Sequence, residues 1–205
     1  MISIITGDIV NSQQLNNPEV WLKPLKDVFN EFGLSPKIWD IYRGDAFQLE
    51  ISEPGKSLIT AIRIKAVVKK LKGLDVRMAI GLGTVEYASV RITESNGEAF
   101  INSGDLFEKL KENKMNLAIK SPWSDFDKEL NLYLKLLLPV MDNWTTKSAE
   151  LVDLILAKPQ LKQNELADFL GIVQSSVSER QKRTYIDEIL EVNALFNNKL
   201  SNLLE

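Results

Sequence analysis

The chain has 205 residues, with 25 Lys and Arg against 28 Asp and Glu, and a formal net charge of -3. Its 44% apolar and 26% charged residues are typical of a globular protein of one or two domains and exclude a disordered chain. It has no Cys and no His, which excludes disulfides, thiol nucleophiles, Ser-His triads and zinc sites built on those residues. A bound metal is therefore expected to be a hard cation held by oxygen, which favours Mg²⁺.

No segment has the pattern of a membrane span. The most apolar run, residues 130–141, is shorter than the roughly 20 residues that cross a bilayer, and it contains Lys135 and Pro139. The first basic residue is Lys23, so the basic start of a secretory signal is missing. We expect a cytoplasmic protein that does not interact with a membrane.

Strand and helix patterns alternate in the first 120 residues. They predict strands over 2–6, 38–42, 47–51, 76–85 and 116–120, and helices over 18–33, 56–72 and 98–111. Arg43, Gly44 and Asp45 are typical of a tight hairpin turn between the second and third strands. The order is that of the split βαβ, or ferredoxin-like, βαββαβ plan with additions.

The second half of the chain has helical patterns only. No convincing strand follows Phe126, and Pro159 interrupts the helical pattern, so it is expected to separate two helices. The sequence therefore predicts an α+β fold in three parts. These are a ferredoxin-like domain over 1–121, a connecting helix over 122–143 and an all-α domain over 144–205.

Two aspartates stand where this plan brings them to one edge of the sheet. Asp8 sits at the C-terminal end of the first strand, and Asp45 lies at the tip of the hairpin that pairs with that strand. Two carboxylates placed in this way can bind Mg²⁺ ions that in turn hold a triphosphate. On spacing alone the simpler interpretation is favoured, in which Asp8 caps a turn and Asp45 is an ordinary turn residue.

Three short motifs follow one another in this half of the chain. They are Asp8-Ile9-Val10-Asn11-Ser12, Arg43-Gly44-Asp45-Ala46-Phe47 and Val76-Arg77-Met78-Ala79-Ile80-Gly81-Leu82-Gly83. Their succession resembles that of class III nucleotide cyclases. The resemblance implies that Asp8 and Asp45 hold metal ions and that the following residues bind a nucleotide: Ile9, Asn11, Ser12 and Gly44.

The whole chain is still more similar to the SatD family, in which such a domain precedes a helix-turn-helix. Two further stretches carry this likeness, Asn96-Gly97-Glu98-Ala99-Phe100 and Trp144-Thr145 before the C-terminal helices. The resemblance covers nearly the full length. It implies a cyclase-like fold joined to a DNA-binding module.

The fourth motif departs from the cyclases, which place an Asn and then an Arg on one helix face to serve the transition state. Here Asn102 is displaced by one residue, and Asp105 stands at the Arg position. A negative charge there opposes a triphosphate, so we expect poor cyclase activity or none, with Asn102 as a solvated or capping residue. Gly81 and Gly83 are expected to allow close backbone packing, because Gly-Leu-Gly alone is a weak phosphate-loop signal.

Residues 161–180 have the pattern of a helix-turn-helix. Leu166 supplies part of the inner face of the first helix, Gly171 permits the positive φ of the turn, and Val177 is the inward residue of the second helix. Short polar and basic side chains remain on the exposed front, where they suit base edges and phosphates. The predicted DNA-contacting residues are Gln174, Ser175, Ser176, Ser178, Arg180, Lys182 and Arg183.

Charge keeps a second interpretation of this region open. From residue 142 onward, 10 acidic residues face 7 basic ones, whereas DNA-binding domains are usually basic; a helical dimerisation or protein-binding module is the alternative. The favoured hypothesis is a homodimeric DNA-binding transcriptional regulator whose cyclase-like domain binds a nucleotide with Mg²⁺ or serves as a dimer scaffold. The competing hypothesis is an active nucleotide cyclase, or another phosphoryl-transfer enzyme, with a regulatory helical tail.

Overall fold

The computed structural model describes residues 1–15 and 17–205. The strands are β1 (Ile2–Val10), β2 (Trp39–Tyr42), β3 (Ala46–Ile51), β4 (Asp75–Gly83) and β5 (Leu117–Lys120). The helices are α1 (Glu19–Asn30), α2 (Ser57–Lys69), α3 (Glu98–Asn113), α4 (Ser124–Asp142), α5 (Thr146–Ala157), α6 (Gln163–Leu170), α7 (Gln174–Thr184) and α8 (Ile186–Leu204), with short 3₁₀ turns η1 (Ser12–Gln14), η2 (Pro54–Lys56) and η3 (Ile92–Glu94). Across the described residues, no helix is both long enough and apolar enough to cross a membrane.

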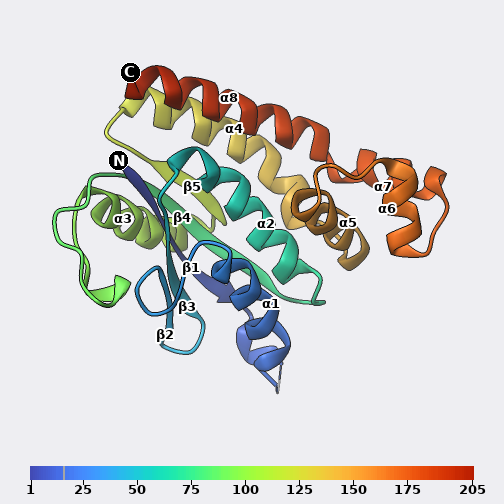
Figure 1. Ribbon diagram of the computed structural model, residues 1–205, viewed down its shortest axis with the longest axis horizontal. Coiled ribbons are helices and arrows are strands. Elements are labelled where there is room, and N and C mark those ends of the chain that lie inside the picture. Colours follow the sequence, from blue (N-terminus) through green and yellow to red (C-terminus); the bar gives the residue numbers. More distant parts are fainter. Residues whose placement is uncertain (16) are drawn as a thin grey trace.

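The five strands of the described residues form one mixed sheet in the order β2-β3-β1-β4-β5. The pairs β2–β3, β3–β1 and β1–β4 are antiparallel, and β4–β5 is parallel. The sheet comes first in the chain and is followed by helices alone (Figure 1). The expected α+β class, with a helical C-terminal region, is therefore confirmed.

The first strand is longer than the 2–6 stretch that the apolar pattern predicts. β1 continues to Val10, with Asp8 paired to Ala46 on one side and Arg77 on the other. Asp8 therefore lies near the C-terminal end of the strand, as predicted, and Ile9 and Val10 extend the strand beyond it. The reason is tertiary, because β1 is central and two neighbours provide partners for its backbone beyond the apolar residues.

Helix α3 covers one face of the sheet at very short distance. A Cβ built on Gly81 would lie 2.3 Å from the carbonyl oxygen of Ala99, and one on Gly83 would lie 2.5 Å from its amide nitrogen. Only a residue without a side chain allows this approach of helix to strand. The two glycines thus serve backbone packing, as their sequence context predicts.

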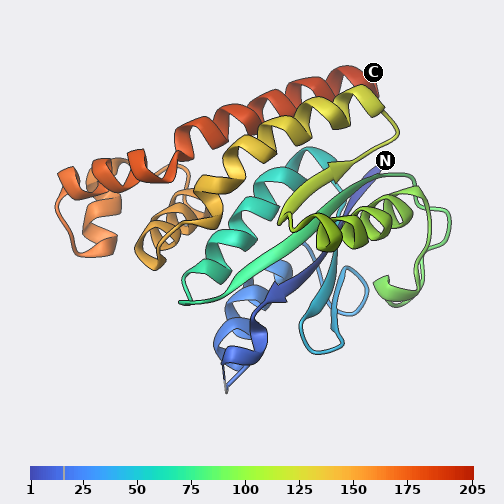
Figure 2. The same cartoon turned by 180° about the vertical axis from the view of Figure 1, so that it is seen from behind.

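Helices α1 and α2 cover the other face, and the C-terminal helices form a further layer over α2. Figures 1 and 2 show α4 and α8 side by side above α2, with α5 next to its far end. One hydrophobic core runs from Ile5 in the sheet through Ile62 in α2 to Phe196 in α8. The predicted boundary at 143/144 lies within this continuous core, beside the buried Trp144, whose Nε1 donates a hydrogen bond to the Thr184 carbonyl oxygen at 3.1 Å.

Candidate functional site

An open pocket of about 470 Å³ forms where β1 leaves the sheet. It is lined by Asp8, by the segment that follows it, by Asp45 from the β2–β3 turn and by Arg77 from β4. The lining includes most of the residues that the resemblance singles out, namely Asp8, Ile9, Asn11, Ser12 and Asp45. Gly44 instead lines a neighbouring pocket beside β2.

The carboxyl group of Asp8 lies next to one cation and is otherwise poorly satisfied. Its Oδ2 lies 3.9 Å from Nη1 of Arg77, its cross-strand neighbour. Its Oδ1 is buried and has no hydrogen-bond partner among the described residues. Burial raises the pKa of Asp8 above its ordinary value, and the positive charge of Arg77 opposes this rise.

Asp45 is tied to the loop after β1. The Ser12 hydroxyl donates a hydrogen bond to Oδ2 of Asp45 at 2.5 Å, and the Ile9 amide donates to the Asp45 carbonyl oxygen at 3.1 Å. Asn11 has a left-handed conformation, with φ of 64°, and its side-chain amide donates to the Gly73 carbonyl oxygen at 3.1 Å. The loop therefore turns back sharply, and both Asp8 and Asp45 line one pocket.

The donor set of this pocket fits Mg²⁺ with outside ligands. Asp8 and Asp45 both line the pocket, and Asp8 has a buried oxygen, Oδ1, that no hydrogen bond in the described residues satisfies. No cluster of three or more acidic residues able to hold a metal occurs in the described parts of the chain. Mg²⁺ is commonly held by one or two carboxylates together with water and phosphate oxygens, and Asp8 and Asp45 can supply that protein share.

The residues at the catalytic positions of the fourth motif have other contacts. Asn102 is buried, and its side-chain amide donates to the Leu82 carbonyl oxygen at 2.8 Å. The sequence-based prediction of a solvated or capping residue is therefore wrong for Asn102. The close approach of α3 to β4 buries it. Asp105 is exposed and lies 3.3 Å from Nζ of Lys120.

The helices α6 and α7 project at the end of the molecule opposite both chain termini (Figure 1). Gly171 adopts φ of +63° between them, and the Ile172 amide donates to the Ala167 carbonyl oxygen at 3.0 Å. Val177 is fully buried in a small core that includes Leu166. The expected turn and inward residues are thus found at these positions.

The predicted DNA-contacting residues differ in exposure. Gln174, Ser175, Lys182 and Arg183 are exposed, whereas Ser176, Ser178 and Arg180 are half-buried. Arg183 lies 3.3 Å from Glu179, one turn earlier on the same helix. The Gln174 side chain bonds to Gln163 at the start of α6.

Sequence reasoning did not single out two of the residues at these sites, Arg77 and Gln163. Arg77 belongs to a quoted motif, but only the β1–β4 register places it beside Asp8. Gln163 precedes Gln174 by 11 residues, and only the angle between α6 and α7 brings their side chains together. Neither contact has a signal in the local sequence pattern.

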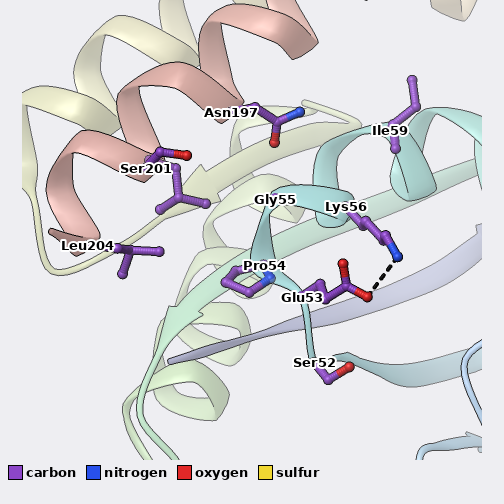
Figure 3. A pocket seen from close by; sticks show the side chains of 10 residues that line it. Ser52, Glu53, Pro54, Gly55, Lys56, Ile59, Asn197, Ser201 and Leu204 are labelled. Carbon is purple, nitrogen blue, oxygen red and sulfur yellow. Dashed lines mark hydrogen bonds and ion pairs between the residues drawn. The ribbon is translucent and has the colours of Figure 1, made fainter.

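A further pocket lies between the β3–α2 connection and the end of α8. Figure 3 shows Pro54 and Gly55 facing Asn197, Ser201 and Leu204 across it. Its charged residues are already paired, since Lys56 lies 2.7 Å from Glu53. It therefore has fewer unpaired charged groups for a ligand than the Asp8 pocket.

Fold and sites together define an α+β protein with an acidic pocket at the sheet and a pair of short helices at the opposite end from the termini. The SatD family model matches residues 1–195, and the chain belongs to the SatD family. No curated protein matches the chain, and no solved structure does.

Proposed function

We propose that the chain is a DNA-binding transcriptional regulator in which α6 and α7 act as a helix-turn-helix. The observation that carries the proposal is the α6–Gly171–α7 unit, which buries Val177 and leaves the start of α7 exposed. In such motifs the N-terminal residues of the second helix contact base edges in the major groove. Gln174 and Ser175 occupy that place here.

The charge around this unit is locally favourable although the C-terminal region is acidic. Arg180, Lys182 and Arg183 lie on α7, and Lys158 and Lys162 lie before α6. These five cations outnumber the three acids of the unit, which are Glu165, Asp168 and Glu179. A single copy offers few phosphate contacts, so we propose a homodimer that binds two half-sites about 34 Å apart; light scattering should give twice the 23.2 kDa chain mass.

For the N-terminal part we propose a cyclase-like, catalytically degenerate domain that binds a nucleotide with Mg²⁺ or supports the dimer. The β2-β3-β1-β4 order, with β1 between two antiparallel neighbours, supports the split βαβ plan. Asp8 and Asp45 would hold the metal, and Arg77 would face the phosphates from the same pocket. The bound ion would supply positive charge for a triphosphate.

An active nucleotide cyclase is the second candidate, and the placement of Asp8 and Asp45 in the lining of one pocket is the observation that favours it. The engagement of Asn102 with a main-chain carbonyl and the acidic Asp105 favour the degenerate form. Incubation of the purified protein with ATP or GTP and Mg²⁺ separates the two. Steady accumulation of a cyclic product would overturn the degenerate interpretation.

The DNA-binding proposal is tested by selecting bound fragments from a genomic library and titrating the preferred duplex at two salt concentrations. Arg180→Ala should weaken binding to all sequences and reduce the salt slope by about 1, because one phosphate contact is lost. Lys128→Ala is the matched control, since Lys128 is exposed on α4 beside Asp125. If no duplex is bound, the DNA-binding proposal is wrong and the helical region is instead a protein-binding module.

The nucleotide proposal is tested by thermal shift with ATP or GTP and Mg²⁺. A ligand at 100 times its Kd should stabilise the fold by about 2.7 kcal/mol, and Asp45→Asn should abolish most of that gain. Asp27→Asn, an exposed acid on α1, is the control. No shift with any nucleotide would contradict the site.

A further inference from the structure

Four polar side chains link the helix-turn-helix to the start of α8 in one directed chain of hydrogen bonds. Gln174 Nε2 donates to Gln163 Oε1, and Gln163 Nε2 donates to Gln181 Oε1 at 2.9 Å. Gln181 Nε2 in turn donates to Asp187 Oδ1 at 2.8 Å. We call these four residues the amide ladder.

The direction of the ladder follows from its last member. An ionised Asp187 can only accept hydrogen bonds, so Gln181 must turn its NH₂ group toward it. The oxygen of Gln181 then faces Gln163, whose NH₂ group must donate, and Gln163 in turn presents its oxygen to Gln174. The carboxylate thus assigns the orientation of amide groups that could otherwise rotate by 180°.

The free end of the ladder is the amide of Gln174, at the first residue of α7. One N–H of its NH₂ group is used by Gln163, which leaves the second N–H as a donor. Its Oε1 accepts no hydrogen bond within the described parts of the chain. Gln174 is exposed, so it presents an adjacent donor and acceptor to the solvent.

An adjacent donor and acceptor match one base in the major groove. Adenine presents N7 as an acceptor and N6–H₂ as a donor, and Gln is a bidentate partner for this pair, whereas guanine presents two acceptors. We propose that Gln174 reads an adenine in each half-site, and that Gln163, Gln181 and Asp187 are positioning residues that hold its amide for this purpose. This inference rests on the proposed DNA-binding function and adds to it the identity of a base and three residues outside the predicted contact set.

The test uses the full chain and duplexes selected from a random pool. We expect one A·T pair per half-site to be enriched by the wild type and no longer by Gln174→Ala, with a discrimination of about 5- to 150-fold lost. Replacing that adenine with 7-deazaadenine removes the N7 acceptor. It should weaken the wild type by about 2- to 10-fold and leave Gln174→Ala unaffected.

The positioning role is tested with two acids in the first turn of α8. Asp187→Ala removes the acceptor that directs the ladder, and Glu188→Ala removes an equally placed acid outside it. Asp187→Ala should lower the preference for adenine over other bases several-fold, with little change in binding to unrelated duplexes, and Glu188→Ala should not.

The outcomes separate the two proposals. Sequence-specific binding with no enriched adenine, or an equal 7-deazaadenine loss in the wild type and Gln174→Ala, would overturn this inference and leave DNA binding standing. Equal loss of affinity for all bases in Asp187→Ala would make Asp187 a structural residue and overturn its positioning role. No DNA binding by the wild type would overturn the proposed function itself.

Discussion

At the scale of single residues, the carboxyl group of Asp8 is held where its charge is disfavoured. It is half-buried on the central strand, one of its oxygens has no partner in the described structure, and Arg77 compensates from 3.9 Å. Ionisable groups with raised or lowered pKa values are often found at functional sites. The free-energy cost of partly burying the Asp8 charge would be recovered when a cation binds, which agrees with the proposed Mg²⁺ role.

Asp8→Asn is therefore expected to stabilise the ligand-free protein at pH 7, by about 1 kcal/mol. Burial raises the folded-state pKa above the model-peptide value of 3.8, so the folded state binds the proton more tightly than the unfolded state does. Stability from this group is therefore lost as pH rises through the window between the two pKa values. The gain from Asn should be present at pH 7 and absent below about pH 4.

Thermal unfolding at pH 7 and pH 3.5 checks this, with Asp40→Asn as the comparison. Asp40 is buried and lies 2.6 Å from Arg91, so its substitution should lower the melting temperature at pH 7. A lower melting temperature for Asp8→Asn at pH 7 would show that Arg77 satisfies Asp8 fully.

At the scale of elements, the packing of α3 on β4 fixes the shape of the sheet face. Gly81 and Gly83 let the helix backbone approach the strand, and this approach buries Asn102 against Leu82. Thr6 on β1 donates a hydrogen bond to the Ser103 hydroxyl at 3.0 Å in the same layer. A helix held this closely cannot move aside for an added methyl group.

Gly81→Ala should destabilise the protein by about 3 kcal/mol, because its Cβ would meet backbone atoms at 2.3 Å. Gly104→Ala is the matched control on α3. Its added Cβ meets nothing within 4 Å, and Ala favours the helix by about 0.5 to 1 kcal/mol. Denaturant unfolding should therefore show a lower free energy of unfolding for Gly81→Ala and a higher one for Gly104→Ala. A change in the same direction for both variants would refute the close-packing account.

At the scale of the whole molecule, a buried ionic cluster joins the sheet, α2 and the C-terminal helices. Lys65 in α2 is fully buried and lies 2.6 Å from Asp75, at the start of β4, and 2.6 Å from Asp142, at the end of α4. Lys69 also contacts Asp75, at 3.1 Å, and donates to the Asp142 carbonyl oxygen at 2.6 Å. The cluster ties the end of α4 to α2 and to the start of β4.

Lys65→Met should destabilise the chain by about 3 kcal/mol, because two half-buried carboxylates lose the fully buried cation between them. Lys128→Met, which breaks the exposed pair with Asp125, should have little effect. Unfolding followed by far-UV circular dichroism and by tryptophan fluorescence should stay coincident, since one core includes the sheet and the tail. Two transitions at different denaturant concentrations would indicate that the C-terminal helices unfold separately from the sheet.

The amino-acid sequence determined the local elements, because hydrophobic periodicity and turn residues act over a few positions. It was enough to predict the strand and helix order, the Gly171 turn, the inward Val177 and the two glycines of β4. It did not determine the length of β1, the burial of Asn102, the contact of Arg77 with Asp8 or the amide ladder. Those depend on strand register and on the angle between helices, which arise from pairings between residues far apart in the chain, and only the tertiary structure decided them.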